Sequence, residues 1–464
     1  MPRFWLALVL ALCIVADACG ETQVTTDTLR LTFDDAGQLK LAVACFPACA
    51  GENVRVQQFG SDGVIVLENL PGGRWERTEH RSDTHHEFTF RHAGGASLTW
   101  KIPLRGYRLE LEQRGVAGIS IRSGESFRPR PAAGFGNWLE QSRYVIIHEG
   151  SAHQVGLDET EVEEQTADQW IGYRNRYWTL MAGAPQAVKA RLTAAEGNTD
   201  ARLDLDSSPD WSFYLGPVEP RVLAATDPAL SELLYAGLWF WLRWICFALF
   251  HLLAGIQSVI PSWGLAVMVL SLSVNILMTP LSRIAERFQQ DVNETEARLA
   301  PELSRIKKNF KGEEQSAKIL ALYKTERVHP LYSLKSLMGV AVVIPVFIGA
   351  FDMLAENIHL LDTGFLWISD LSRPDDLFRL PFTLPFFGNE LNLLPFLMTG
   401  LSVIASALHN PLALNAELRA KQVRNMLLLA VAFFVLFYTF PAGMVLYWTT
   451  NNLISVIKSL WARR

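Results

Sequence analysis

Polar side chains recur along one face of a strongly apolar stretch of the chain. In residues 263–283, WGLAVMVLSLSVNILMTPLSR, the polar residues Ser271, Asn275, Thr279 and Ser282 follow at spacings of 4, 4 and 3. That spacing places them on one face of an α-helix, opposite a face of Leu, Ile, Val and Met. Hydroxyl and amide groups bind through hydrogen bonds, to other protein or to water. A helix with such a face needs a partner if it lies in a bilayer, because polar groups that face lipid stay unsatisfied.

A second polar face lies near the end of the sequence. Within residues 442–460 it comprises Tyr447, Asn451, Ser455 and Lys458, with Thr450 and Asn452 nearby. Two such faces in one bundle predict a hydrophilic groove inside the membrane, with the candidate residues Ser271, Asn275, Thr279, Tyr447, Thr450 and Asn451. The alternative is that these residues only bond one helix to another, where such pairs contribute about 0.6 kcal/mol on average.

The helices that must position these faces can be read from hydropathy and charge. Residues 263–283 suffice to cross a bilayer core, since about 20 residues at 1.5 Å rise span roughly 30 Å. Four further spans are predicted near 337–354, 391–408, 426–440 and 442–460. The section between the first two spans carries ten Lys or Arg residues, which indicates that it stays in the cytoplasm. We expect a cytoplasmic hairpin over 284–330, with helices near 284–309 and 313–328, whereas the loop 357–390 is exported.

Composition indicates one soluble part and one membrane part. The 464 residues are 50% hydrophobic and 19% charged, with a formal net charge of −5, and the sequence divides near residue 225. This balance gives no reason to expect nucleic acid as a partner. Residues 231–260 are apolar and rich in tryptophan, so we predict an interfacial amphipathic helix, a full span being the alternative. The transmembrane core, with its cytoplasmic hairpin, then occupies residues 261–464.

The N-terminus reads as a targeting segment. Residues 1–21 combine Arg3, an apolar run and Ala16-Asp17-Ala18. A cleaved signal peptide, a retained anchor and a lipidated Cys19 all remain open. In each case the following residues are exported.

Residues 22–225 predict an extracytoplasmic domain of antiparallel β-strands. Short alternating runs such as LRLTFDD, HEFTFRH and SLTWKI are separated by Gly, Asp, Asn and Pro at about ten-residue spacing. Cys45 and Cys49 either form a disulfide or stay as two buried thiols. Six of the ten histidines fall here, but neither metal-ligand spacing nor a G-x-S-x-G nucleophile motif is present. We therefore predict no catalytic residue, metal or cofactor.

Five motifs resemble those of the YidC-type membrane insertases, the bacterial relatives of the mitochondrial Oxa and chloroplast Alb proteins. They are MTPLS, ALYKTERVHPL, IPVFIGAFDML, FLWISDLSRPDDLFRLP and FPAGMVLYWTTNNLISVIK, which occur in family order between residues 231 and 462. Upstream, WSFYLGPVEP is similar to the end of the periplasmic domain of Gram-negative members. That domain would make residues 22–225 a β-supersandwich.

The resemblance implies an insertase and chaperone that is not an enzyme. In the family, a five-helix core encloses a groove that is open to the cytoplasm and to lipid but closed on the outer side. The implied location is the bacterial inner membrane, with residues 22–225 in the periplasm. The implied partners are nascent membrane proteins and the lipid bilayer, with the Sec translocon and the ribosome as further candidates.

One position departs from the family pattern. Where family members usually carry a groove arginine, this sequence has Asn275, four residues after Ser271 and five before Pro280. The sequence therefore predicts a groove without a fixed positive charge and poor insertion of strongly acidic segments. Lys335 and Lys458 are the candidates for restoring a charge.

Two other classes of protein stay open from the sequence. A secondary transporter would use the same polar faces to bind a solute, but the chain shows no internal repeat. A membrane-anchored carbohydrate-binding envelope protein would bind its ligand through residues 22–225, where no sequence motif indicates a binding pocket.

Overall fold

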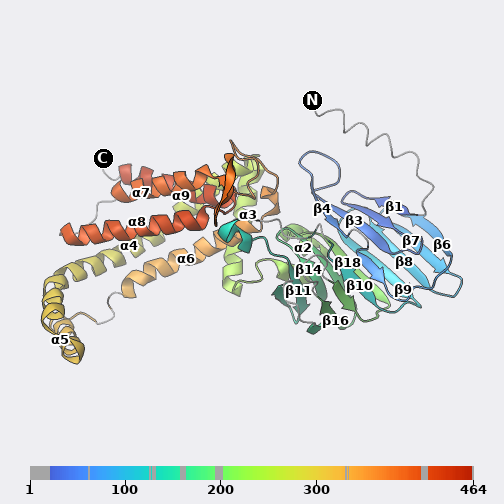
Figure 1. The fold of residues 1–464 in the computed structure, drawn as a ribbon, viewed down its shortest axis with the longest axis horizontal. Coiled ribbons are helices and arrows are strands. Elements are labelled where there is room, and N and C mark those ends of the chain that lie inside the picture. The colour runs from blue at the N-terminus through green and yellow to red at the C-terminus, as the bar shows by residue number, and fades with distance from the viewer. Residues whose placement is uncertain are drawn as a thin grey trace. The chain divides into compact units, whose positions relative to one another are not determined.

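The computed structural model describes residues 21–60, 63–124, 127, 132–156, 163–193, 202–329, 332, 334–408 and 416–461. The predicted targeting segment, with Cys19, lies outside these residues but for Glu21. The described chain forms two compact units (Figure 1). The first comprises Met1–Pro131 and Trp138–Ala236, and the second comprises Ala132–Asn137 and Gly237–Arg464.

The first unit is a sandwich of two antiparallel sheets, as the strand pattern predicts. Within the described residues, one sheet has the order β1-β2-β3-β5-β10-β17-β16-β13, with β4 paired to β3. Its strands are β1 (Thr22–Thr25), β2 (Leu29–Phe33), β3 (Leu39–Phe46), β4 (Arg55–Phe59), β5 (Ile65–Leu67), β10 (Ile119–Arg122), β13 (Glu163–Ala167), β16 (Val188–Thr193) and β17 (Arg202–Leu205).

The second sheet has the order β12-β11-β14-β15-β18-β9-β8-β7-β6. Its strands are β6 (Trp75–Arg81), β7 (His85–His92), β8 (Ser97–Pro103), β9 (Arg108–Arg114), β11 (Arg143–His148), β12 (Ser151–Gly156), β14 (Trp170–Arg174), β15 (Trp178–Gly183) and β18 (Asp210–Pro217). Alternate side chains are buried along β7, β8 and β9, which is the period of two that a half-buried strand requires.

Aromatic side chains fill the space between the sheets. The Trp100 ring from one sheet packs 5.3 Å from Phe33 of the other, and the Trp100 Nε1 donates to the Gly37 carbonyl at 2.8 Å. Cys45 and Cys49, which the sequence left open, form a disulfide. The unit ends in α2 (Pro220–Thr226), capped by the Glu219 carboxylate, and the short helix η3 (Pro228–Leu233).

The second unit is a bundle of apolar helices. Its helices are α3 (Phe240–Val259), α4 (Trp263–Asn309), α5 (Gly312–Thr325), α6 (Leu334–Ala355), α7 (Leu393–Leu408), α8 (Ala416–Phe437) and α9 (Ala442–Trp461). Among the described residues, α3 and α4 are long and apolar enough to cross a membrane, and α6, α7 and α8 contain shorter apolar helices. Together with the sandwich, these helices confirm the predicted fold class.

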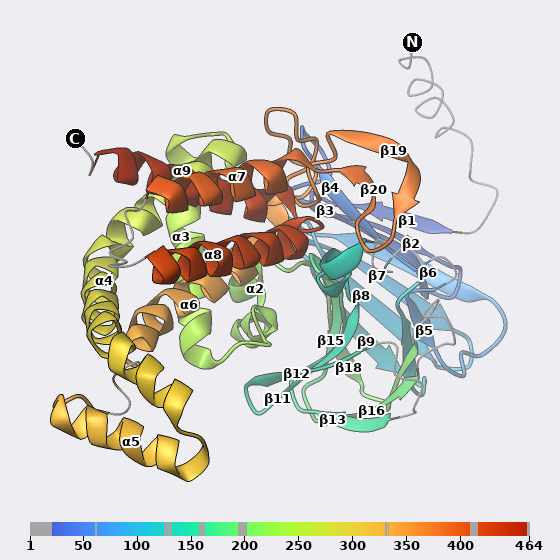
Figure 2. The ribbon, with the colours of Figure 1, turned by 60° about the vertical axis from the view of Figure 1, so that its left-hand side comes forward.

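Two helix boundaries differ from the sequence prediction. The helix expected from residue 231 begins at Phe240, because Leu234 is extended and Tyr235 has a φ of 53°. The first span and the first helix of the hairpin form one helix, α4, which continues through Pro280 and Pro301. Figure 2 shows α4 leading into α5 at the end of the bundle remote from the strands β19 (Phe378–Leu384) and β20 (Gly388–Leu391).

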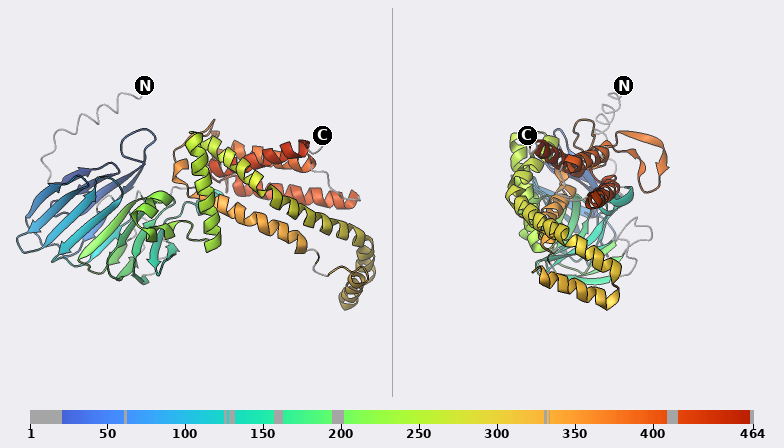
Figure 3. Two further views of the ribbon diagram at one scale, coloured as in Figure 1. Left: turned by 180° about the vertical axis from the view of Figure 1, so that it is seen from behind. Right: turned by 90° about the vertical axis from the view of Figure 1, so that its left-hand side faces the viewer.

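Helix α3 does not run along the bundle. It crosses the ends of the other helices, as Figure 3 shows from behind. It packs closely on α6, where a Cβ on Gly349 would lie 2.7 Å from the Ile245 side chain. Trp239, Phe240 and Trp244 are exposed on it, a distribution typical of a helix at a membrane interface.

Candidate functional site

Helices α4 and α9 run parallel and in register. Ser271 bonds to residue 447 and Asn275 to residue 451, and the separation is 176 residues in both pairs. A constant offset means that the two chains advance in the same direction with matching turns. The two polar faces predicted from the sequence therefore meet along one line.

Four side chains form the contact that we call the polar seam: Ser271, Asn275, Asn451 and Lys458. Ser271, 1% exposed, donates its hydroxyl to the Tyr447 carbonyl at 3.0 Å. The Asn275 Nδ2 donates to the Asn451 Oδ1 at 2.6 Å, and the Asn275 Oδ1 accepts from the Lys458 ammonium. The Asn275 amide thus uses both of its ends, one toward a neutral amide and one toward a cation.

The remaining predicted groove residues bond mainly within their own helices. The Thr279 hydroxyl donates to the Asn275 carbonyl and the Thr450 hydroxyl to the Leu446 carbonyl, both at 2.8 Å. The Tyr447 ring is buried and lies edge-on to Trp448. These residues line the same region without joining the seam.

Two residues that make contacts between helices, Asn452 and Lys458, were not among the predicted groove residues. Asn452 donates from Nδ2 to the Met398 carbonyl at 2.9 Å, which fixes α9 to α7. Lys458, seven residues beyond Asn451, continues the polar face, and that spacing is the signal in the sequence. It carries the charge that residue 275 lacks, whereas the side chain of Lys335 is not among those that the structure describes.

The ammonium of Lys458 is held on an exposed side of the bundle. The Lys458 side chain is exposed, and Asn275 is half-buried. Among the residues that the structure describes, no carboxylate forms an ion pair with Lys458. The seam is therefore buried at Ser271 and opens outward at its charged end.

Residues 357–390 close one end of α7 and α9. The Asp375 carboxylate accepts hydrogen bonds from the backbone N–H groups of Leu393 and Leu394, at 2.7 and 3.0 Å, and from the Trp367 indole at 3.1 Å. These backbone groups are the unpaired donors at the start of α7. The FLWISDLSRPDDLFRLP motif thus contains a helix cap.

The same loop also caps α9. The N–H groups of Ala442 and Gly443 donate to the carbonyls of Arg373 and Leu371, at 2.6 and 2.8 Å. At the start of α4, a Cβ on Gly264 would lie 2.1 Å from the ring of Phe365. The loop therefore packs directly on the ends of three helices and seals this end of the bundle.

A hollow in the first unit provides no comparable site. It is lined by Trp170 and Trp211 with acidic residues around them. Both rings are buried, and the Trp170 Nε1 already donates to the Asp227 carboxylate at 3.0 Å. The described residues that line this hollow therefore present no open aromatic face to a sugar. Within the part of the chain that the structure describes, no group of three or more potential metal ligands occurs.

The family model "60Kd inner membrane protein" matches residues 255–464, which contain the seam and the closed end. Those residues belong to the YidC-type insertase family. The family predicted from the sequence is thereby confirmed. A membrane protein insertase YidC of Marinomonas sp. (strain MWYL1) is 32% identical over 333 residues, covering 69% of this chain and 54% of that protein. The YidC insertase of Janthinobacterium sp. (strain Marseille) is 31% identical over 253 residues, covering 54% and 42%.

The chain spans about half the length of the curated YidC relatives that it matches. A crystal structure of an active YidC insertase with its first transmembrane domain resolved aligns with a TM-score of 0.38 and 16% identity over 99% of both chains. The assignment of residues 255–464 to the YidC-type family rests on the sequence matches.

Proposed function

We propose that the chain is an insertase and chaperone for nascent inner-membrane proteins. It would work without hydrolysing a nucleotide. The observation that carries this proposal is the exposed ammonium of Lys458, held by the half-buried Asn275 on the open side of a bundle of apolar helices. Among the described residues, no group of three or more potential metal ligands accompanies it.

The depth of the seam supports a role in the membrane. Asn275 lies twelve residues from the start of α4 at Trp263, or about 18 Å at 1.5 Å per residue. A hydrocarbon core is roughly 30 Å thick. The ammonium therefore lies near the middle of the apolar layer that the bundle would span.

An exposed ammonium at that depth needs water or a polar partner, because ionisable groups inside membranes face protein or hydrated cavities. We therefore place a hydrated groove along the open side of the seam. A polar client segment that enters this groove crosses less hydrocarbon. Each charge at the centre of a bilayer costs about 2.5–3.5 kcal/mol on insertion scales, so even a short hydrated path lowers the barrier.

The closed outer end gives the groove a direction. Loop 357–390 caps α7 and α9 and packs on α4, so the groove opens toward the other end of these helices. A segment entering from the cytoplasm would stop beneath this closure while its apolar helix moves into lipid.

Lys458 reverses the expectation of a groove without charge. In the sequence, the missing arginine at residue 275 predicts poor insertion of acidic segments. Because the Lys458 ammonium binds the Asn275 amide, the positive charge comes from α9 instead of α4. We propose that acidic client segments are accepted through this lysine.

The proposed placement follows from charge and disulfide chemistry. The hairpin 284–330 is rich in Lys and Arg, which favours the cytoplasm, and the Cys45–Cys49 disulfide fits an oxidising periplasm. The hairpin is then available to the ribosome, and the Sec translocon is a further partner to test.

The experiment is to deplete a bacterial host of its own insertase, express this chain and follow growth and the insertion of a small Sec-independent membrane protein. Rescue is expected from the wild type and from Gly255→Ala, a glycine with no neighbour within 4 Å of an added Cβ. A double change of Ser271 and Asn275 to Leu should fail to rescue at equal membrane abundance. No rescue by a correctly inserted wild-type chain would contradict the proposal.

A further inference from the structure

The hairpin of β19 and β20 exposes more apolar surface than a two-stranded ribbon in water can sustain. Phe378 is 52% exposed, Phe382 58%, Leu384 38%, and Phe386 at the turn 44%. Within the described chain, the two strands pair only with each other. A two-stranded hairpin is marginally stable at best in water. Phe386 already packs on Phe135, with ring centroids 5.0 Å apart, but the other exposed apolar side chains need a further surface to cover them.

We propose that this hairpin docks on the outer surface of the bilayer and is a second interfacial anchor of the bundle. The proposal rests on the bundle lying in a membrane and does not depend on whether the chain inserts other proteins. The partner is the boundary between lipid headgroups and acyl chains.

The base of the hairpin is fixed at the end of the bundle. Asp376 donates its N–H to the Asn392 Oδ1 at 3.1 Å, and the Asn392 Nδ2 donates to the Tyr438 carbonyl at 2.7 Å. The Tyr438 hydroxyl donates back to the Glu390 carbonyl at 3.0 Å. The hairpin is thus anchored where α7 begins and α8 has ended, which is interface depth for two apolar helices.

Aromatic packing is continuous from the hairpin to the helices, through the buried ring of Tyr438. Phe386 contacts Phe387, Phe387 contacts Tyr438 and Tyr438 contacts Phe396, with ring centroids 5.3, 5.0 and 6.3 Å apart. Phe396, in the first turn of α7, contacts Phe434 of α8 at 4.8 Å and is itself exposed. Phe396 on α7 and Phe386 on the hairpin are thus two exposed aromatic side chains joined by one packed cluster, and a bilayer that covers the first lies close to the second.

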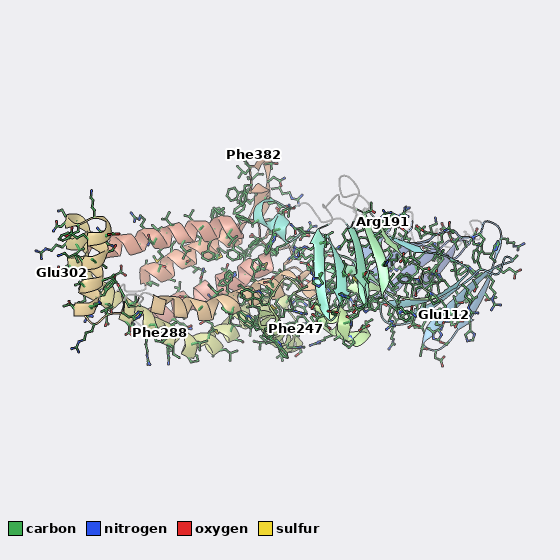
Figure 4. The ribbon with its side chains drawn as sticks, turned by 90° about the horizontal axis from the view of Figure 1, so that it is seen from below. Glu112, Arg191, Phe247, Phe288, Glu302 and Phe382 are labelled. Atoms are coloured by element: carbon green, nitrogen blue, oxygen red, sulfur yellow. A yellow bond between two sulfur atoms is a disulfide. The ribbon has the colours of Figure 1, made fainter. Side chains whose placement is uncertain are left out.

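The hairpin extends from the bundle on the side opposite α3. Figure 4 shows Phe382 of the hairpin and Phe247 of α3 on opposite sides of the helices, and the end-on view of Figure 3 agrees. Helix α3 exposes Trp239 and Trp244, whose rings suit an interface. Two aromatic projections at one end of a bundle would hold it in the bilayer from both sides.

The chemistry of the hairpin favours lipid over a peptide partner. Pro381 lies within β19 and Pro385 follows it, and a proline has no N–H to offer an added strand. The Arg379 guanidinium of the hairpin is already paired, with Asp376 at 3.1 Å and with Glu390 at 3.8 Å. What remains available is aromatic and aliphatic surface next to a small charged base.

The test uses the full chain in vesicles of phosphatidylethanolamine and phosphatidylglycerol that contain brominated lipids. An environment-sensitive fluorescent amino acid replaces Phe382 in one variant, Trp244 in a second and Glu302 in a third. Residue 244 is the positive reference on α3. Residue 302 is exposed on α4, at the end of the bundle remote from β19 and β20 (Figure 4), and is the negative reference.

We expect quenching at position 382 to match that at 244, to be stronger with bromine near the headgroup than near the chain end, and to be absent at 302. Position 382 behaving like 302 while 244 is quenched would place the hairpin in water and overturn the proposal. Shielding of 382 only after a client or translocon protein is added would also overturn it, since the partner would then be a protein.

Discussion

The end of the bundle that residues 357–390 close, which we call the outer end after its proposed placement, and the polar seam share helices α4 and α9, but their polar groups are arranged in opposite ways. At the outer end, the buried Asp375 carboxylate accepts three hydrogen bonds, and Gly264 leaves no room for a Cβ against Phe365. At the seam, Asn275 bonds to an exposed lysine. A rigid, satisfied end beside an open, charged interior is what a groove with one entrance requires.

Gly264→Ala should have the largest effect, because the new Cβ would overlap the Phe365 ring at 2.1 Å. We expect the free energy of unfolding in detergent to fall by about 1–3 kcal/mol, the usual range for overpacking. Gly255→Ala in α3 is the matched control, with no atom near the added Cβ, and should change stability by no more than about 1 kcal/mol. Equal stability of the two variants would show that the outer end is not tightly packed.

Asp375→Ala should weaken the same end from the polar side. It removes the acceptor for the first N–H groups of α7 and for the Trp367 indole, and loss of a helix cap costs about 0.5–2 kcal/mol. Limited proteolysis within loop 357–390 should become faster than in the wild type. Asp362→Asn, a change at an exposed carboxylate in the same loop, should leave the rate unaltered. Equal cleavage rates in all three proteins would show that the Asp375 carboxylate does not stabilise this end of the bundle.

Lys458→Met should act on function with little effect on folding, because its side chain is exposed. A hydrogen bond between an acidic client group and the charged Lys458 ammonium would contribute about 1.5–3 kcal/mol. A difference of 1.4 kcal/mol corresponds to about a tenfold change in an equilibrium constant. Insertion of a client with an acidic translocated segment should therefore fall about tenfold, while its neutral counterpart is inserted as before. Lys458→Arg should retain the insertion of the acidic client. Lys308→Met, in the helical hairpin over 284–330, is the control. Equal losses for both clients would assign Lys458 a structural role.

Much of the bundle follows from periodicity and charge. The stripe at Ser271, Asn275 and Asn451 predicts which faces meet, since an α-helix aligns residues three and four apart. The Lys458–Asn275 contact joins residues 183 apart, and no local pattern fixes such a pair. Only the packing register of α4 against α9 brings them together.

The sequence missed two features for other physical reasons. The continuity of α4 was hidden by Pro280 and by the change from apolar to polar residues after Arg283, although the helix continues through both. The β-hairpin of β19 and β20 was not predicted, because residues 357–390 were treated as a loop. Phe378, Leu380 and Phe382 nevertheless occupy alternate positions, as apolar residues do in a strand.

The smallest predicted effect is a pH dependence of the outer end. Burial, and then the Asp376 carboxylate, raise the pKa of Glu390 above its ordinary 4.5, against the opposing effect of Arg379. The folded state therefore holds the proton more tightly, so its stabilising effect is complete below pH 4.5 and is lost as the pH rises through the raised pKa. Thermal unfolding of Glu390→Gln should show a flatter pH profile in this window. An unchanged profile would contradict the assignment.

The most direct test of the central claim is insertion by the purified chain alone. The chain is reconstituted into vesicles, and a small client with a short polar translocated segment is added as it is synthesised. Protection of that segment from external protease should appear with the wild type and Gly255→Ala, and should be lost when both Asn275 and Lys458 are changed to Leu and Met. Protection equal to that in protein-free vesicles, or unaffected by the double change, would contradict an insertase that works through the polar seam.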